Sequence, residues 1–268
     1  MLLCIDVGNT NVVVGVFNQG KLIDKFRLAT DIKRSADEYG VLMVQMFRHQ
    51  GIDPHDMEDS IIATVVPSLL FTMQHMCFKY FDVNPIVVGA GIKTGLKIKC
   101  DDPRNVGADR IVNSVAAHNK YKGDLIVVDF GTATTFSIIT AEGEFLGGAI
   151  APGIKTSAAA LFEHTAKLPN VDLEVPENVI GKNTILAMQS GLIYGHMGMA
   201  ERLIKSMKNE LEEYYGKDKN HIKVIATGGL ANLVNDGINA IDIIDKRLTL
   251  DGLVFIYERN RNHPRKKF

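Results

Sequence analysis

The pattern of apolar and polar positions changes its period along the first half of the chain. Short runs rich in valine, isoleucine and leucine are typical of strands, whereas apolar residues three and four apart between Ser35 and Gly51 predict a helix. Short polar turns separate the first three runs, so these form hairpins before helices and strands alternate. The expected strands span residues 2–7, 12–17, 21–28, 60–66 and 85–88, and a second helix is expected from residue 67 to about 81.

The second half of the chain begins with the same pattern. Residues 124–140, DLIVVDFGTATTFSIIT, hold two β-branched runs around a glycine-containing turn, and a third strand is expected over residues 145–150. A long helix from about Thr184 to Tyr215 and a strand at residues 223–226 follow. The repeat predicts an α/β fold of duplicated βββαβαβ units with a cleft between the halves, divided into domains 1–118 and 119–268.

Each half carries an acid at the end of its first strand, followed by a glycine turn. Burying an unpaired carboxylate costs several kcal/mol, so each acid should meet a positive partner. Glycine lets the backbone approach a ligand, amide and hydroxyl side chains add donors, and a carboxylate beside phosphates can hold Mg²⁺. The alternative is that the polar side chains only satisfy the turns. The candidate phosphate-binding residues are Asp6, Gly8, Asn9, Thr10, Asn11, Asp129 and Thr132.

Two further stretches offer candidate chemistry. Gly228 and Gly229 follow the strand at residues 223–226, where bare backbone can accept a flat ring or a phosphate. Asp109 lies at the front of an amphipathic helix, near the junction of the two halves. An acid there can cap the helix, and it can also orient an acceptor hydroxyl in phosphoryl transfer, a reaction that needs phosphate anchors, a metal and one carboxylate.

Composition narrows the class of protein. The 268 residues carry a net charge of −1, which favours small-molecule work over binding to nucleic acid or an anionic membrane. The basic tail at residues 259–268 is more typical of a solvated terminus than of a nucleic-acid contact. No apolar run is long enough to span a membrane, and we expect a cytoplasmic protein. Cys4, Cys77 and Cys100 fit no paired metal spacing and are expected to be reduced, buried thiols.

Five motifs, taken together and in this order, resemble type III pantothenate kinase of the acetate and sugar kinase, Hsp70 and actin superfamily. The resemblance implies two ribonuclease H-like, actin-like halves and phosphorylation of pantothenate by ATP, the first step of coenzyme A biosynthesis. It also implies Mg²⁺, a monovalent cation such as K⁺ or NH₄⁺, and a homodimer. The motifs are DVGNTN at residues 6–11, VGADR at 106–110, DFGTATT at 129–135, PGIKTS at 152–157 and TGGLA at 227–231.

The resemblance also implies roles for individual residues. Residues 6–13 would meet the ATP phosphates, and Asp6 would support the metal. Asp129 would bind potassium and Thr132 would bind ATP. Cys100 departs from the family, in which many members carry a tyrosine near the substrate. Pantothenate would be bound by Gly107, Ala108, Asp109 and Arg110, with Asp109 as the proton acceptor, and by Thr184, reaching the substrate from the partner subunit.

Two other functions fit the same residues. One is a kinase or phosphatase of the same superfamily that acts on another small hydroxyl compound or acid. The other is a nucleotide-regulated regulatory protein without catalysis, which needs both phosphate turns but no acceptor-side base. The GADR stretch at residues 107–110 argues against the second alternative.

Overall fold

The computed structural model describes residues 1–234 and 237–262, and the chain divides into two compact units. The first unit comprises Met1–Leu96, Asp101–Asn119 and the residues from Arg247 on. The second comprises Lys97–Cys100 and Lys120–Lys246. The expected boundary at residue 118 placed the C-terminal residues in the second half, whereas in the structure they join the first unit because the last helix packs on its sheet.

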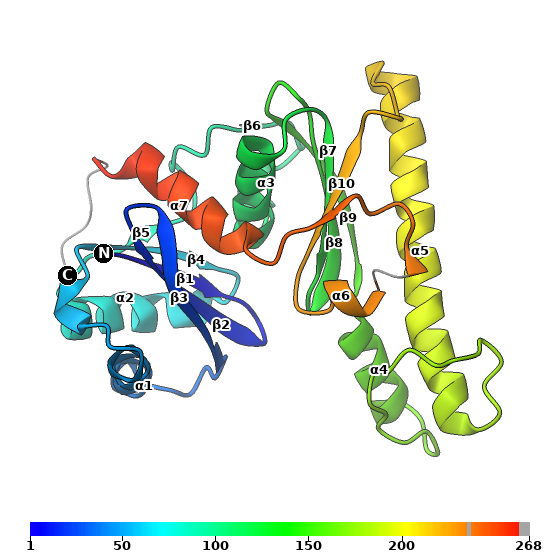
Figure 1. The fold of residues 1–268 in the computed structure, drawn as a ribbon, viewed down its shortest axis with the longest axis horizontal. Helices are drawn as coiled ribbons and strands as arrows, with labels where there is room; N and C mark the ends of the chain where they lie inside the picture. The colour runs from blue at the N-terminus through cyan, green and yellow to red at the C-terminus, as the bar shows by residue number, and fades with distance from the viewer. Residues whose placement is uncertain (235–236, 263–268) are drawn as a thin grey trace. The chain divides into compact units, whose positions relative to one another are not determined.

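The first unit is built on a mixed five-stranded sheet (Figure 1). Its first three strands pair antiparallel as hairpins, and the two later strands add parallel to the first one. The central strand is covered on both faces, as its apolar sequence requires. In the order β3-β2-β1-β4-β5, the strands are β1 (Leu2–Val7), β2 (Asn11–Asn18), β3 (Lys21–Ala29), β4 (Asp59–Thr64) and β5 (Ile86–Val87).

Among its described residues, the first unit has four α-helices. Ser35 and Glu38 form a capping box that starts the first helix at the expected place, because each side chain satisfies a backbone N–H of the other residue. Gly40 lies against the Tyr80 ring, which brings the first two helices together over a core shared with the sheet. The helices are α1 (Ala36–His49), α2 (Pro67–Phe81), α3 (Ala108–Lys120) and α7 (Leu248–Asn260), and short 3₁₀ turns span Pro54–Asp56 and Pro103–Asn105.

The second unit repeats the first sheet and adds one edge strand. The order β9-β8-β7-β10-β11 matches β3-β2-β1-β4-β5 in sequence order and in strand direction. This confirms the predicted fold of two similar ribonuclease H-like halves. The strands are β6 (Lys97–Ile98), which pairs parallel with β9 at the edge, β7 (Leu125–Phe130), β8 (Ala133–Ile139), β9 (Glu144–Pro152), β10 (Lys223–Thr227) and β11 (Ile243–Ile244).

In the described part of the second unit, the sheet is accompanied by the helices α4 (Ile154–Glu163), α5 (Thr184–Tyr215) and α6 (Ala231–Val234). The long helix begins and ends at the predicted residues, with Asn183 as its N-cap and Gly216 in the left-handed region after it. Its internal glycines do not interrupt it, because its apolar face is anchored along the sheet. No helix among residues 1–234 and 237–262 is long and apolar enough to cross a membrane. Residues 263–268 of the basic tail lie outside the described part of the chain.

His196 on α5 is buried against the second sheet. Its Nε2 atom lies 2.8 Å from Oγ1 of Thr134 on β8, and its ring packs against the ring of Phe130. Because burial disfavours the imidazolium form, it lowers the pKa of His196 from its usual value of 6.5. The folded protein therefore holds this side chain neutral at pH values where the unfolded chain begins to protonate it.

We expect His196 to lower the free energy of unfolding as the pH decreases. Between pH 7 and pH 5 the unfolded chain binds a proton at residue 196 more readily than the folded chain, so the contribution is complete above pH 6.5 and is lost as pH falls below it. In His196→Gln this part of the slope disappears. Melting temperatures of both proteins across the range measure it, and parallel curves would contradict the prediction.

Candidate functional site

The first acidic turn joins β1 to β2 at the edge of the sheet where parallel strands β1 and β4 both end. Asp6 is partly exposed and pairs with Val13 and Ala63 in the ladder, one residue before the strand end. The Gly8 N–H donates to the Asn11 carbonyl at 3.0 Å and closes the turn. Ligands of open α/β sheets bind outside the carboxyl ends of parallel strands, which is the place of this turn.

The first turn also receives two hydrogen bonds from Thr30, the residue after β3. Its N–H donates to the Thr10 carbonyl at 3.0 Å, and its Oγ1 donates to the Gly8 carbonyl at 2.7 Å. Asn9 and Thr10 are exposed. The turn therefore has a fixed backbone and side chains that can reach a ligand, which fits the predicted phosphate site.

Asp109 lies in the first turn of α3, close to the same edge of the first sheet. Its Oδ1 accepts the N–H of Arg110 at 2.8 Å, so the predicted structural role in the first helical turn is present. A side chain at Gly107 would meet that oxygen at 2.5 Å and would touch Val65 at 4.0 Å. The Val65 N–H in turn donates to the carbonyl of Val7 at the end of β1. The structure thus brings the GADR stretch to the carboxyl ends of β1 and β4, within the same unit as Asp6.

The second acidic turn occupies the equivalent place in the second sheet. Asp129 lies beside Thr227 of β10, so the acid again stands at the carboxyl ends of two parallel strands. A side chain added at Gly131 would lie 3.5 Å from Asp129 Oδ1, and one at Gly228 would lie 2.5 Å from the same atom. Gly228 has a φ of +97°, a conformation that favours glycine. The predicted turns at residues 131–132 and 228–229 therefore meet around one carboxylate.

A third glycine completes this cluster in the second unit. Gly153, between β9 and α4, donates its N–H to the Thr132 carbonyl at 3.1 Å, and a side chain there would meet the Gly131 carbonyl at 2.4 Å. Oγ1 of Thr156 donates to the same Thr132 carbonyl at 2.6 Å. Sequence reasoning gave no role to Gly153, Thr156 or Thr30. A signal existed in the duplication, because Thr30 and Gly153 both directly follow the third strand of their halves.

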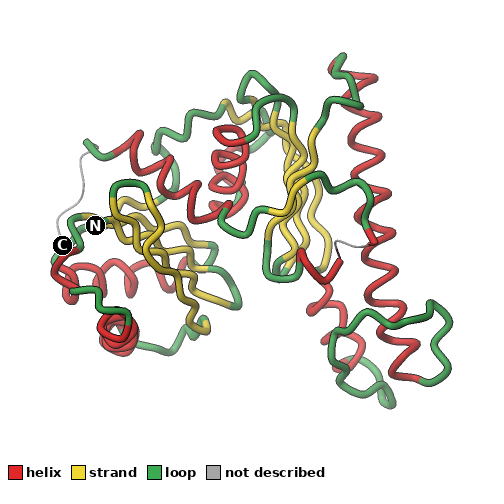
Figure 2. Tube along the Cα trace, in the orientation of Figure 1, coloured by secondary structure: helices red, strands yellow, loops and turns green. Residues whose placement is uncertain are grey.

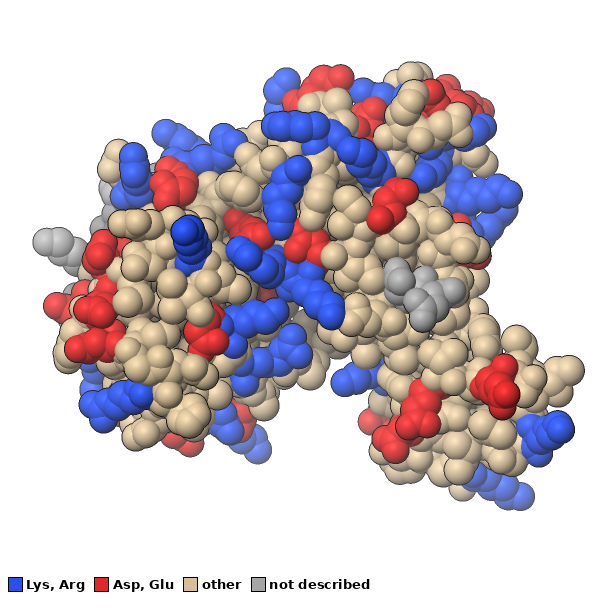
Figure 3. Space-filling view, in the orientation of Figure 1, with Lys and Arg blue, Asp and Glu red and all other residues tan. Residues whose placement is uncertain are grey.

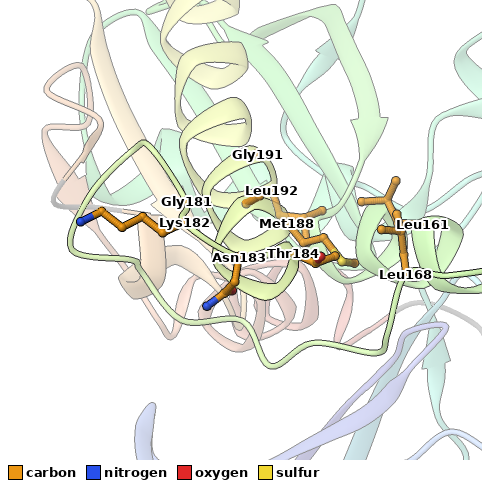
Figure 4. A pocket seen from close by; sticks show the side chains of 10 residues that line it. Leu161, Leu168, Gly181, Lys182, Asn183, Thr184, Met188, Gly191 and Leu192 are labelled. Carbon is orange, nitrogen blue, oxygen red and sulfur yellow. The ribbon is translucent and has the colours of Figure 1, made fainter.

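Thr184 lies apart from this cluster, at the first turn of α5 on the rim of a cavity of 640 Å³ (Figure 4). Leu161, Leu168, Met188 and Leu192 give the cavity apolar walls, and Lys182 points away from the two leucines. The loop of residues 164–183 passes from α4 to the start of α5 (Figure 2), and the cavity lies beneath its end. The full lining is Leu161, Leu168, Gly181, Lys182, Asn183, Thr184, Ala187, Met188, Gly191 and Leu192.

Side chains of α5 hold the loop of residues 164–183 on the helix. Gln189 donates to the Asp172 carbonyl, Ser190 to the Val179 carbonyl and Tyr194 to the Pro176 carbonyl. At Gly181 an added side chain would lie only 2.3 Å from a backbone atom of α5. The backbone of this loop is therefore held directly on the helix, and Thr184 has a defined position at its edge.

The donor set fits cations that share their ligands with phosphates. Among residues 1–234 and 237–262, no group of three or more histidine, cysteine, aspartate or glutamate side chains could hold a metal ion alone. Asp6 and Asp129 each offer one carboxylate beside a glycine turn, at the carboxyl ends of parallel strands. Mg²⁺ commonly binds through one or two carboxylates with substrate phosphates and water, so the residues fit the predicted ion.

The cysteines follow the sequence prediction in part. Cys4 and Cys77 are fully buried, and burial raises the pKa of the Cys77 thiol to about 12. Cys100 is only partly buried, so the expectation of three buried thiols is wrong for this residue, which lies in a short segment just after edge strand β6. All three are free thiols.

The duplicated ribonuclease H-like halves, each with an acidic glycine turn at the carboxyl ends of its parallel strands, define the actin-like class of nucleotide-dependent folds. Within it, the type III pantothenate kinase family model matches residues 2–206. The chain belongs to the type III pantothenate kinase family, a family of phosphotransferases.

Solved structures agree on the fold. A Campylobacter jejuni protein described as a Baf family transcriptional activator shares 20% identity and a TM-score of 0.61, covering 97% of this chain and 99% of its own. A Sinorhizobium meliloti protein described as a 2-dehydro-3-deoxygalactonokinase has 9% identity and a TM-score of 0.55, covering 100% and 99%. The Clostridium difficile activator of 2-hydroxyisocaproyl-CoA dehydratase, solved with ADPNP, has 10% identity and a TM-score of 0.52, with the same coverage. At these identities the likeness concerns the fold.

Proposed function

We propose that this protein phosphorylates pantothenate with ATP to form 4'-phosphopantothenate, the first step of coenzyme A biosynthesis. The observation that carries the proposal is the position of Asp109. Within a chain of the pantothenate kinase family, it stands in the first turn of α3, and the neighbouring Gly107 lies near Val65, at the carboxyl ends of β4 and of β1, the strand that carries Asp6. A phosphate turn and a candidate acceptor-side base thus share one unit.

In the first unit, we assign the DVGNTN turn to the ATP phosphates and Asp6 to Mg²⁺. The metal would neutralise phosphate charge there, in a shell completed by phosphate oxygens and water. Gly107, Ala108 and Arg110 would bind pantothenate next to Asp109, and the guanidinium of Arg110 suits the carboxylate of that substrate. The first-turn residues assigned to ATP are Gly8, Asn9, Thr10 and Asn11.

In the second unit, we assign Thr132 to an ATP phosphate and the bare backbone of Gly228 and Gly229 to the adenosine. Asp129, enclosed by the turns at residues 131 and 228, would hold the monovalent cation, K⁺ or NH₄⁺. These assignments use a cluster in which three predicted motifs meet within a single unit, and the closeness of Gly131 and Gly228 to the Asp129 carboxylate supports them.

Asp109 would align the primary hydroxyl of pantothenate with the γ-phosphoryl group and accept its proton. The transition state of phosphoryl transfer is loose, so the proton leaves late and alignment contributes more than basicity. The hydrogen bond from the Arg110 N–H holds the carboxylate in place, and the absence of a side chain at residue 107 leaves the space that it occupies. The chain's contribution to the step is therefore orientation and a proton acceptor.

Dependence on two kinds of cation is expected, since each sheet carries its own acid at a phosphate turn. Chelation of Mg²⁺ should abolish turnover, and replacement of K⁺ by tetramethylammonium at constant Mg²⁺ should reduce it strongly. Initial rates in the two series measure the effects separately. Full activity in Mg²⁺ with sodium or tetramethylammonium as the sole monovalent cation would contradict the Asp129 assignment.

We also propose a homodimer that uses the surface around Thr184. The segment at residues 185–200 is richer in apolar and small residues than a solvated helix needs, but Leu192, Ile193 and Met197 are buried in the unit's own core, which explains part of its composition. The stronger support is exposed apolar surface beside it, since Ile180 is 83% exposed. In Figure 3 this part of the molecule, at the lower right, shows uncharged surface between separate acidic and basic side chains. The other exposed apolar residues here are Phe162, Val175, Val179, Ile185 and Leu186.

Light scattering at micromolar concentration should give twice the mass of the 29.5 kDa chain. Ile180→Asp would put a charge into the proposed contact and should shift the mass toward the monomer. Ile23→Asp, at an exposed residue on β3 of the first unit, is the matched control. A monomeric wild-type protein would overturn the proposed dimer.

The substrate is tested with one coupled assay. ATP, Mg²⁺ and K⁺ are combined with pantothenate or with a panel of sugars and acetate, and release of ADP is followed. Among these acceptors, we expect turnover only with pantothenate. Turnover with another acceptor would favour a different kinase of the superfamily, and nucleotide binding without any turnover would favour a regulatory protein.

A further inference from the structure

We propose that Thr30 and Thr156 are positioning residues that hold the carbonyl groups of the two phosphate turns away from the ATP phosphates. The proposal rests on the proposed function, because it takes both turns as phosphate sites. Neither residue would touch the nucleotide; each acts through the backbone of its turn.

In the first unit, Thr30 engages two carbonyls of one short turn. Its N–H donates to the Thr10 carbonyl at 3.0 Å and its Oγ1 donates to the Gly8 carbonyl at 2.7 Å. The first bond continues the β2–β3 register, in which Asn11 pairs with Ala29. The second is added by the side chain, and it fixes a carbonyl that the ladder does not reach.

In the second unit, two residues donate to one carbonyl of the turn. The Gly153 N–H donates to the Thr132 carbonyl at the equivalent register, after the pair of Ala133 with Pro152. The hydroxyl bond to that carbonyl comes from Thr156, three residues further on in α4, at 2.6 Å. Duplication accounts for the backbone bond in both halves. The hydroxyl bonds come from non-equivalent positions, so each half has its own threonine on a turn carbonyl.

The chemistry of phosphate gives these bonds a purpose. Phosphate oxygens at neutral pH mainly accept hydrogen bonds, so a carbonyl dipole aimed at them is repulsive and an N–H is attractive. A trans peptide is planar, and its C=O and N–H point in opposite directions. Fixing the Gly8 carbonyl on Thr30 therefore directs the Asn9 N–H the other way, and fixing the Thr132 carbonyl directs the Ala133 N–H.

The test replaces each hydroxyl by a methyl group of similar shape. Thr30→Val and Thr156→Val should each raise the dissociation constant and the KM for ATP roughly 3- to 10-fold, because each loses one hydrogen bond that orients the turn. The KM for pantothenate and kcat should stay within about twofold of wild type. Thr30→Ser restores the hydroxyl and should restore ATP affinity. Thr165→Val is the matched control, because its Oγ1 also donates to a backbone carbonyl, that of Leu161 at 2.7 Å, outside both turns.

The outcomes separate this proposal from the proposed function. Wild-type protein that binds no ATP would overturn both. If the wild-type protein binds ATP and Thr30→Val and Thr156→Val bind it equally well, only the positioning role is overturned. The same holds if the variants melt at a lower temperature but keep their affinity for ATP. Because Thr156 is exposed, its variant should fold even where Thr30→Val does not.

Discussion

Asp109→Asn should lower kcat by roughly 10²–10⁴-fold, because the amide keeps the shape of the side chain but cannot accept the proton of the pantothenate hydroxyl. Affinity for ATP should stay near wild type, since the assigned phosphate turns are unchanged. The contribution of Asp109 to the stability of the helix is smaller than its expected contribution to kcat. Its Oδ1 accepts one N–H of the first helical turn, that of Arg110, and the amide oxygen can accept the same bond. Steady-state kinetics, ATP titration and thermal unfolding on one preparation separate these effects.

Asp53→Asn is the matched control for that experiment. Asp53 caps the short 3₁₀ turn at Pro54–Asp56 and accepts the His55 N–H at 2.9 Å, so it supplies the same kind of local bond outside the proposed site. It should leave kcat unchanged. If Asp109→Asn behaves like Asp53→Asn, with a shift in melting temperature and full kcat, then Asp109 serves the helix only and the proposed mechanism is wrong.

The hairpins and their duplication could be predicted because the signals are local. Alternating apolar runs around short glycine turns define β1 to β3, and the same pattern returns in β7 to β9. The Ser35–Glu38 capping box and the Asn183 cap set helix starts at the expected residues for the same reason. At these helix starts, the residues within four positions of the boundary were sufficient to predict it.

The return of the chain to the first unit could not be predicted from such signals. Helix α7 packs on β1 and β4, and it approaches α3 so closely that a side chain at Gly252 would lie 2.2 Å from the Val112 carbonyl. Short strands β6 and β11 are two residues each and are defined by their neighbours. The packing of α7 joins residues more than a hundred positions apart, and β6 and β11 form only by pairing with β9 and β10, so local sequence signals do not display these elements.

The candidate site, like the fold, could be predicted only in part from the sequence. Residue types identified the two acids and their turns, but the space around them depends on the fold. Gly107 matters because the Asp109 carboxylate fills the place of its missing side chain, and Gly153 matters because it lies on the carbonyls of residues 131 and 132. Neither distance follows from spacing along the chain. Sequence therefore names the reacting groups, whereas the packing of bare backbone around them appears only in the structure.

Gly228→Ala should show how much that packing contributes. At a φ of +97° an alanine is strained, and its Cβ would lie 2.5 Å from Asp129 Oδ1 and 2.6 Å from the N and O atoms of Phe130. Two of these three atoms belong to the backbone of a central strand, so the turn must move and the Asp129 carboxylate with it. We expect a loss of roughly 2–3 kcal/mol in the free energy of unfolding and a fall of about tenfold or more in ATP affinity.

The variant Gly216→Ala separates the effect of backbone strain from that of the steric clash with Asp129 and Phe130 in Gly228→Ala. Gly216 also has a positive φ, of 63°, at the end of α5, but nothing lies within 4 Å of an added Cβ. Its variant should lose about 1 kcal/mol of stability through strain alone and bind ATP like wild type. Denaturant unfolding and ATP titration of both variants measure the difference. Should Gly228→Ala lose stability while keeping its affinity for ATP, the turn at residues 228–229 is structural, and the adenosine must be held elsewhere in the second unit.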